Sequence, residues 1–225
     1  MELDSLRPLT ASHQRAMEAA VDQYALNVTV AQEWLAARGI EDASVATYRL
    51  GVVDEPIPGH ERYKGMLCIP YLDQFTRVTQ VRFRCLQDHD CKERFHGKYE
   101  TMPGDPSRIW NIGAFASFGD VLHVTEGEFD AMILNQLGFN AVGCPGVSTW
   151  KPRHTVGARG FNAVYVWGDG DRAGREFNAQ MYQTLPNARL ISMPDGHDIT
   201  SLHQSEGAES VRERFEESHR LYGGV

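Results

Sequence analysis

The sequence predicts an α/β fold, in which a parallel sheet flanked by helices is preceded by a small α+β subdomain. The second half of the chain predicts the parallel sheet, because short apolar runs there alternate with helical patterns. The runs lie near 121–125, 140–143, 163–167 and 188–193, and the helical patterns near 128–137, 172–184 and 207–219. The first half lacks this alternation, so we predict two domains, 1–115 and 116–225.

The elements of the first domain are predicted in chain order from local signals. Residues 28–40 have the apolar spacing of a helix that a glycine ends, and 41–51 suit a second short helix. The Pro-Ile-Pro-Gly sequence at 56–59 indicates a linker. Beyond it, 66–73 and 79–84 have the pattern of paired strands.

Length and composition limit the class of protein. A chain of 225 residues with 42% hydrophobic residues can form one large or two small domains, at about 100–200 residues per domain. It contains no run of about 18 apolar residues, which a membrane-spanning helix would need. Residues 1–5 lack the basic start and apolar stretch of a signal peptide. We therefore expect a cytoplasmic protein with no membrane partner.

The charge pattern limits how the chain can bind nucleic acid. Its net charge of −8 gives no general attraction for polyanions. Basic residues are nevertheless concentrated in one short stretch: Arg77, Arg82, Arg84, Lys92, Arg94 and Lys98. Binding would use this stretch, together with metal ions that neutralise carboxylates. The alternation in 81–84 equally suits a half-buried strand whose arginines face water.

The cysteine pattern indicates neither a disulfide framework nor zinc. The four cysteines are few and irregularly spaced: Cys68, Cys85, Cys91 and Cys144. Two of them have His89 and His96 nearby in the sequence. Structural zinc modules usually contain paired Cys-x₂₋₄-Cys segments. Because that spacing is missing, the sequence argues against zinc here.

Two acidic motifs follow predicted strands. Asp169 and Asp171 flank Gly170 directly after the run at 163–167, and such paired carboxylates suit Mg²⁺. The same motif is also typical of an ordinary turn. Glu126 follows the run at 121–125, at a glycine-bearing turn.

The positions of these motifs predict a shared site. Negative charge at a helix N-terminus explains either motif alone, including Asp130 at the start of the next helix. It does not explain the pair. Ligands gather at the carboxyl ends of strands in parallel sheets, so we expect both motifs at one sheet edge. A third acidic segment, with Asp195 and Asp198, follows the last strand at the same edge.

Residues 126–130 and 168–175 together resemble the acidic motifs of the Toprim domain of topoisomerases, primases and certain nucleases. The form Glu-Gly-x-x-Asp followed by Asp-Gly-Asp-x-Ala-Gly-Arg is most similar to DnaG-type primases, and the resemblance covers roughly 25–205. The segment 28–51 is similar to the opening of DnaG-type catalytic cores. The resemblance therefore implies a Toprim-type sheet in the second domain.

The resemblance also implies roles for individual residues. The candidates for binding nucleic acid or nucleotide are Arg82, Arg84, Lys98 and Arg108. The catalytic candidates are Glu126, Asp169, Asp171 and Lys98, and the candidate ligands of Mg²⁺ or Mn²⁺ are Glu126, Asp130, Asp169, Asp171 and Asp198. Thr200 stands where the family has a further aspartate, which leaves the number of metals open, and Asp195 is a candidate replacement. Whether Glu126 acts as a metal ligand or as a general base also stays open.

The function implied is DNA-directed RNA primer synthesis by metal-dependent nucleotidyl transfer during replication. Its partners would be a single-stranded DNA template, NTPs, a separate zinc-binding primase subunit and a replicative helicase, because the chain resembles a catalytic core alone. Such a reduced primase would suit a phage. A Toprim nuclease that hydrolyses phosphodiesters is one alternative, and a non-catalytic nucleic-acid-binding or assembly subunit is another. Template preference and oligomeric state stay open.

Overall fold

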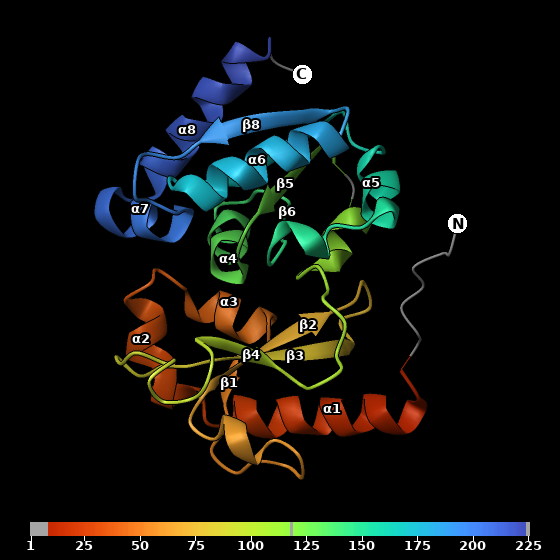
Figure 1. The fold of residues 1–225 in the computed structure, drawn as a ribbon, viewed down its shortest axis with the longest axis vertical. Helices are drawn as coiled ribbons and strands as arrows, with labels where there is room; N and C mark the ends of the chain where they lie inside the picture. The colour runs from red at the N-terminus through yellow and green to blue at the C-terminus, as the bar shows by residue number, and fades with distance from the viewer. Residues whose placement is uncertain (1–8, 118, 224–225) are drawn as a thin grey trace. The chain divides into compact units, whose positions relative to one another are not determined.

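The computed structural model describes residues 9–117 and 119–223, which form two compact units (Figure 1). The first unit contains Glu41–Pro106 and the described part of Ser5–Ala37. The second contains Arg38–Ile40 and the described part of Ser107–Val225. The division falls at 106/107, whereas the sequence placed it at 115/116. Residues 1–5, on which the signal-peptide argument rested, lie outside the described residues.

The first unit is built on an antiparallel sheet of order β1-β2-β3-β4. Its strands are β1 (Gly51–Val52), β2 (Leu67–Leu72), β3 (Val78–Arg84) and β4 (Tyr99–Thr101). Its helices are α1 (Ala11–Ala25), α2 (Gln32–Ala36) and α3 (Asp42–Thr47), with 3₁₀ segments η1 (Val28–Ala31) and η2 (Glu61–Tyr63). The single helix predicted for 28–40 is therefore wrong: it divides into η1 and α2. The β-branched residues at its start favour helix weakly, which is consistent with the division.

The core of the first unit lies between α1 and the sheet. Met17, Val21 and Tyr24 of α1 are buried together with Phe83 of β3. Phe83 also stacks on Tyr63, with ring centroids 4.0 Å apart. Residues 56–59, predicted as a linker, lie inside this unit. They are held there because the backbone N–H of Ile57 donates to the buried Tyr24 hydroxyl at 3.1 Å.

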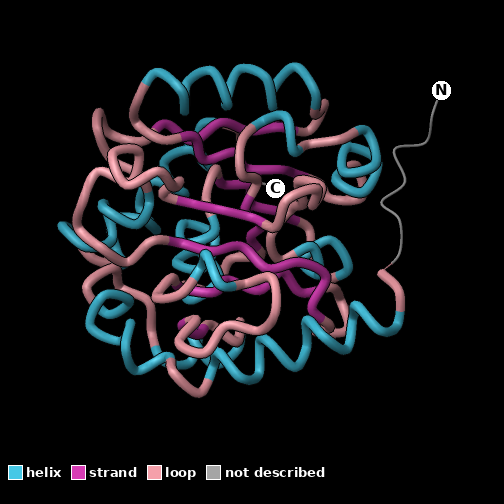
Figure 2. The backbone as a smooth tube through the Cα atoms, turned by 60° about the horizontal axis from the view of Figure 1, so that its bottom comes forward, coloured by secondary structure: helices cyan, strands magenta, loops and turns pink. Residues whose placement is uncertain are grey.

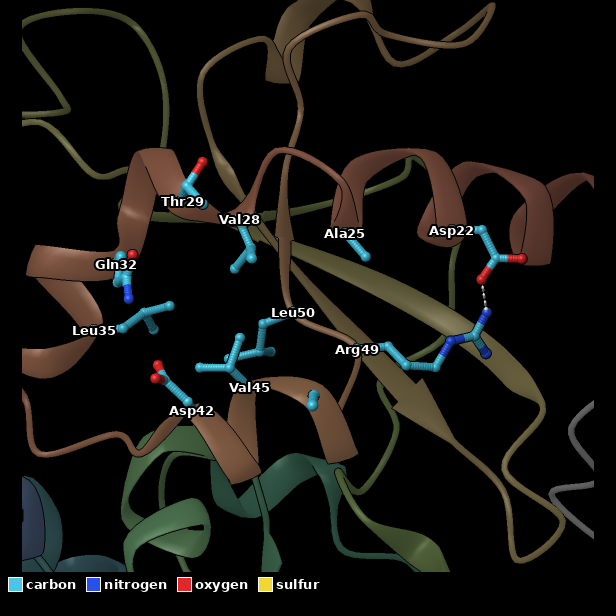
Figure 3. A pocket seen from close by; sticks show the side chains of 11 residues that line it. Asp22, Ala25, Val28, Thr29, Gln32, Leu35, Asp42, Val45, Arg49 and Leu50 are labelled. Carbon is cyan, nitrogen blue, oxygen red and sulfur yellow. Dashed lines mark hydrogen bonds and ion pairs between the residues drawn. The ribbon is translucent and has the colours of Figure 1, made fainter.

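A pocket of about 430 Å³ also belongs to the first unit (Figure 3). Most of its lining is apolar, from Ala25, Val28, Leu35, Val45, Ala46 and Leu50. Arg49 lies at one side, where its guanidinium contacts Asp22 and Glu18 at 2.7 Å each. Both of these acids are on α1, so the arginine joins α1 to the segment that follows α3.

The second unit is a parallel sheet of order β6-β5-β7-β8 with helices between successive strands, which confirms the predicted fold class. Figure 1 labels these strands, and Figure 2 distinguishes strands in magenta from helices in cyan. Its strands are β5 (Val121–Thr125), β6 (Ala141–Gly143), β7 (Ala163–Gly168) and β8 (Ala188–Ser192). Its helices are α4 (Glu128–Gln136), α5 (Pro152–Ala158), α6 (Arg172–Thr184), α7 (Ile199–Glu206) and α8 (Ala208–Leu221), with 3₁₀ segments η3 (Ile112–Ala116) and η4 (Val147–Thr149). Every residue of β7 is buried, as expected for a central strand covered on both faces.

The two faces of this sheet have different cores. Val164 and Val166 of β7 pack with Phe177 and Met181 of α6 in an apolar cluster. On the opposite face, His123 of β5 and Tyr165 of β7 contact the aromatic ring of Phe215 on α8. His123 belongs to this face, and burial lowers its pKa to about 3. Its neutral imidazole accepts a hydrogen bond from Trp167 Nε1 at 3.0 Å.

The helices described within 9–117 and 119–223 are all too short or too polar to span a membrane.

Candidate active site at the carboxyl edge of the parallel sheet

Three neighbouring strands bring acidic side chains to one edge of the second unit. Glu126 directly follows β5, Asp169 directly follows β7, and Asp198 lies between β8 and α7. β7 pairs in parallel with both β5 and β8, so the carboxyl ends of the three strands lie side by side. The contact between the first two motifs is direct: the backbone N–H of Asp169 donates to Glu126 Oε1 at 2.9 Å.

Glycines allow the loops at this edge to lie in contact. A Cβ on Gly174 would lie 2.1 Å from the carbonyl oxygen of Asp169, so the first turn of α6 packs on that residue's backbone. A Cβ on Gly170 would lie 1.8 Å from the carbonyl oxygen of Pro194. The Gly170 N–H also donates to the carbonyl of His197 at 2.7 Å. The spacing of glycines and aspartates in this motif therefore has a steric cause.

Two of the candidate ligands also cap helices. Asp171 Oδ1 accepts from the Gly174 N–H at 2.8 Å at the start of α6, and Asp198 Oδ1 accepts from the Ser201 N–H at 2.6 Å at the start of α7. A carboxylate has two oxygens and about four acceptor sites. Capping a helix and binding a cation are therefore compatible, and capping fixes where each carboxylate lies.

Asp130 differs from the other acids because it is buried, with 8% of its surface exposed. Thr200 donates to its Oδ1 twice, from the backbone N–H at 2.9 Å and from the hydroxyl at 2.7 Å. Burial, with a further contribution from the charge of Asp198, raises the pKa of Asp130 to about 7. Thr200, which stands where the resembled family has an acid, thus serves as a hydrogen-bond donor to Asp130. Sequence reasoning missed this pairing, because 70 positions separate the two residues.

The electrostatics of this edge suit a divalent cation. Burial and the charges of Asp130 and Glu126 raise the pKa of Asp169 to about 8. Burial likewise raises the pKa of Glu126, although the N–H of Asp169 opposes the shift. Clustered carboxylates that raise one another's pKa gain most from a bound cation, and carboxylate oxygens are ligands that Mg²⁺ accepts. Glu126, Asp169, Asp171 and Asp198 therefore fit a hard divalent metal.

Asp195 is placed differently from these acids. Its side chain is fully exposed, and its Oδ1 lies 3.8 Å from Arg175 Nη1. An exposed pair at this distance contributes little to stability. Asp195 therefore lacks the backbone hydrogen bonds that hold Glu126, Asp171 and Asp198 in place.

The basic candidates Arg82, Arg84 and Lys98 lie in the first unit. Arg84 is buried, with its guanidinium carbon 5.2 Å from the ring centroid of Trp34 and 5.1 Å from that of Tyr99. Arg82 lies over the same Tyr99 ring at 4.4 Å. The water-facing alternative from strand alternation is therefore wrong for Arg84, because its planar cation packs against aromatic rings. The sequence pattern around Arg84 did not indicate that its side chain would contact Trp34 and Tyr99.

The two remaining basic candidates have simpler surroundings. Lys98 is exposed and directly precedes β4. Its carbonyl accepts from the Cys85 N–H at 3.0 Å, which closes the connection between β3 and β4. Arg108 is half-buried and belongs to the second unit.

The parallel sheet with carboxylates along its carboxyl edge is the arrangement of a Toprim-type domain, and residues 123–203 match the Toprim-like family. The gene 57 protein of Mycobacterium phage D29 is 38% identical over 68% of this chain and 99% of its own length. The DNA primase of Escherichia coli K12 is 36% identical over 72% of this chain, but this covers only 30% of the primase. A DnaG primase catalytic domain bound to single-stranded DNA superposes with a TM-score of 0.71 at 24% identity, covering 92% of this chain and 82% of that one.

The chain therefore belongs to the same family as the phage gene 57 protein, and its fold is that of DnaG-type primase catalytic cores.

Proposed function

We propose that this chain synthesises RNA primers on single-stranded DNA by transferring nucleotides from NTPs. The observation that carries the proposal is the convergence of three acidic loops, in which Asp169 donates directly to Glu126. The raised pKa of Asp169 supports it, because an edge made of mutually repelling carboxylates is suited to bind metal. The similarity to the DNA primase of E. coli and to a DnaG primase catalytic domain bound to single-stranded DNA supports primer synthesis as the reaction.

In this proposal, Mg²⁺ or Mn²⁺ is held by Glu126, Asp169, Asp171 and Asp198. When bound there, a divalent metal would supply charge neutralisation for the triphosphate. Asp130 supports the edge from a buried position, where Thr200 holds one of its oxygens. Asp169 positions Glu126 through its backbone N–H, whether Glu126 binds metal or accepts the proton of the attacking hydroxyl.

The basic residues would bind the polyanionic substrates. Arg84 offers a guanidinium that packs on two aromatic rings, Arg82 lies over one of them, and Lys98 is exposed to solvent, where it would bind phosphate. Such contacts position nucleic acid and carry little sequence information. Arg108 is a further candidate for the same role. Template selection would then come from partners, for which we propose a zinc-binding primase subunit and the replicative helicase.

A single assay tests this function against its alternatives. The purified chain is incubated with single-stranded DNA, NTPs and Mg²⁺ or Mn²⁺, with Asp171→Asn as the matched inactive variant. Short RNA products that are missing with Asp171→Asn support primer synthesis. Shortened template indicates a nuclease, and binding without either product indicates a non-catalytic subunit. Either of the last two outcomes would overturn the proposal.

A further inference from the structure

Four potential metal ligands converge in the loop between β3 and β4 of the first unit. Cys85 directly follows β3, and His89, Cys91 and His96 lie in the loop that leads to β4. One ligand atom from each of the four side chains lies within 4.8 Å of all the others. Both cysteines are free thiols, and Cys85 is buried while the other three residues are half-buried.

The distances within this group agree with a four-coordinate site. Cys85 Sγ lies 3.6 Å from His89 Nε2, which in turn lies 3.0 Å from His96 Nε2. Around a tetrahedral zinc ion, with Zn–S of about 2.3 Å and Zn–N of about 2.0–2.1 Å, neighbouring ligand atoms lie about 3.3–3.8 Å apart. These two spacings are within a few tenths of an ångström of this range, and every other pair of ligand atoms lies within 4.8 Å. A movement of up to about an ångström would therefore bring all four atoms to tetrahedral spacing.

The surroundings of His96 support the same interpretation. Its Nδ1 lies 3.0 Å from the carbonyl oxygen of Gly97, which suits an Nδ1–H donor and leaves the Nε2 lone pair facing the group. This orienting contact is what metal-binding histidines usually have. The backbone also fixes the register, because the His96 N–H donates to the Cys91 carbonyl at 3.1 Å.

Turn hydrogen bonds hold this loop, without regular secondary structure. Between Arg84 and Tyr99, where every residue is described, it contains neither helix nor strand. Its one aromatic side chain other than the histidines, Phe95, is 95% exposed. A cross-link through side chains would therefore do for this loop what a hydrophobic core does for larger elements.

We propose that Cys85, His89, Cys91 and His96 bind one zinc-class divalent ion as a closed structural site. Two thiolates and two imidazoles suit a borderline-soft transition metal and disfavour Mg²⁺ and Ca²⁺. The two thiolates also balance the charge of the ion. The site clamps the end of β3 to the start of β4, the segment that carries Arg84, Lys98 and Tyr99. This metal site goes beyond the proposed function, because it does not depend on which reaction the carboxylate edge catalyses.

The order of ligands explains why the sequence argued against this site. The chain reads Cys-x₃-His-x-Cys-x₄-His from 85 to 96, with no Cys-x₂₋₄-Cys pair. The ligands are brought together by the turn from Cys91 to His96 and by the return of the chain to β4, where Arg84 pairs with Tyr99.

The test uses the full chain, purified under reducing conditions and loaded with Zn²⁺ or Co²⁺. We expect one zinc per chain by elemental analysis. With Co²⁺ we expect the visible bands of tetrahedral geometry and a near-ultraviolet thiolate-to-cobalt band. Cys91→Ser and His96→Asn should each lower zinc content to well below half an ion per chain and remove the thiolate band or shift the visible spectrum. Both residues are half-buried, so these variants should fold, as circular dichroism would check.

Two controls separate this site from the rest of the protein. Cys144→Ala removes a thiol of the second unit and should keep one zinc. Asp169→Asn with Asp171→Asn disables the carboxylate edge and should also keep one zinc, so the two sites can fail independently. Zinc lost only with the aspartates, an octahedral cobalt spectrum, or a Cys85–Cys91 disulfide under reducing conditions would each overturn the proposal.

Discussion

The carboxylate edge of the second unit and the Cys/His loop of the first unit assemble their ligands in opposite ways. At the edge, parallel strands place each acid, helix N-termini orient Asp171 and Asp198, and glycines let the loops touch. The fold holds these carboxylates although they repel one another, as the pKa of about 8 for Asp169 indicates. In the loop, by contrast, the ligands join an irregular segment that is held by turn hydrogen bonds and has no regular secondary structure.

The difference predicts what a metal does at each place. At the edge, the metal would relieve repulsion in a structure that already exists, and its main effect would be on catalysis. In the loop, the metal would supply structure, and its main effect would be on local stability. Substitutions of the carboxylates at the edge should therefore separate activity from stability, and substitutions of the ligands in the loop should not.

The largest effect is expected from Asp169→Asn. Removing this charge should lower primer synthesis by about 1,000-fold, because a preorganised electrostatic contact to the reacting groups is lost. The same change should leave the melting temperature equal or higher, because a half-buried carboxyl group surrounded by other acids is replaced by a neutral amide. Primer yield and thermal melting measure the two quantities. An active variant, or one that melts well below the wild type, would show that Asp169 is a structural residue.

The next largest effect should come from Gly170→Ala, which tests whether backbone packing holds the edge. The new Cβ would lie 1.8 Å from the Pro194 carbonyl oxygen, so the β7–α6 and β8–α7 loops must separate. We expect a loss of about 3 kcal/mol in the free energy of unfolding, as for severe overpacking. Gly119→Ala is the matched control, because a Cβ there meets nothing within 4 Å. Equal urea midpoints for the two variants would contradict this account.

A smaller effect is expected from pH and Mg²⁺ together. The pKa values of Asp169 and Asp130 in the folded state, about 8 and about 7, lie above their unfolded values. The folded state therefore binds more protons than the unfolded state between about pH 4 and pH 8. Their contribution to stability is fully present below the unfolded pKa and is lost as pH rises through the folded pKa.

Because Mg²⁺ replaces those protons, it should raise the melting temperature more at pH 8 than at pH 5. At ten times its Kd the gain is about 1.4 kcal/mol. Thermal melts at both pH values, with Asp169→Asn as the control that should lose the gain, measure it. An equal gain in melting temperature at both pH values would show that Mg²⁺ does not bind at Asp169 and Asp130.

The smallest effect is expected from Asp195→Asn. Its side chain is fully exposed and its ion pair with Arg175 is long, at 3.8 Å. Melting temperature and primer yield should match the wild type within experimental error, because exposed pairs of this kind contribute little. If this variant loses activity as Asp169→Asn does, then Asp195 takes the role of the aspartate that the resembled family has at the position of Thr200.

Much of the second unit could be predicted from sequence because its signals are periodic and local. The apolar runs at 121–125 and 163–167 became β5 and β7 within one residue, since strands buried on both faces are continuous hydrophobic runs. Two helices without a strong apolar pattern, α5 and α7, were not among those predicted. In the first unit, the continuous helix over 28–40 and the linker at 56–59 were wrong, because a β-branched start and the Tyr24 hydroxyl decide those segments.

By itself, the sequence determined the alternation of strands and helices, and with it the shared edge for Glu126, Asp169 and Asp198. That follows because all parallel strands end at one side of their sheet. Only the tertiary structure decided that Thr200 holds Asp130, that Arg84 packs on Trp34 and Tyr99, and that two cysteines and two histidines meet in one loop. These contacts form because turns and strand pairing bring together residues that are far apart in the sequence. A periodic pattern of side chains does not specify which of these residues meet.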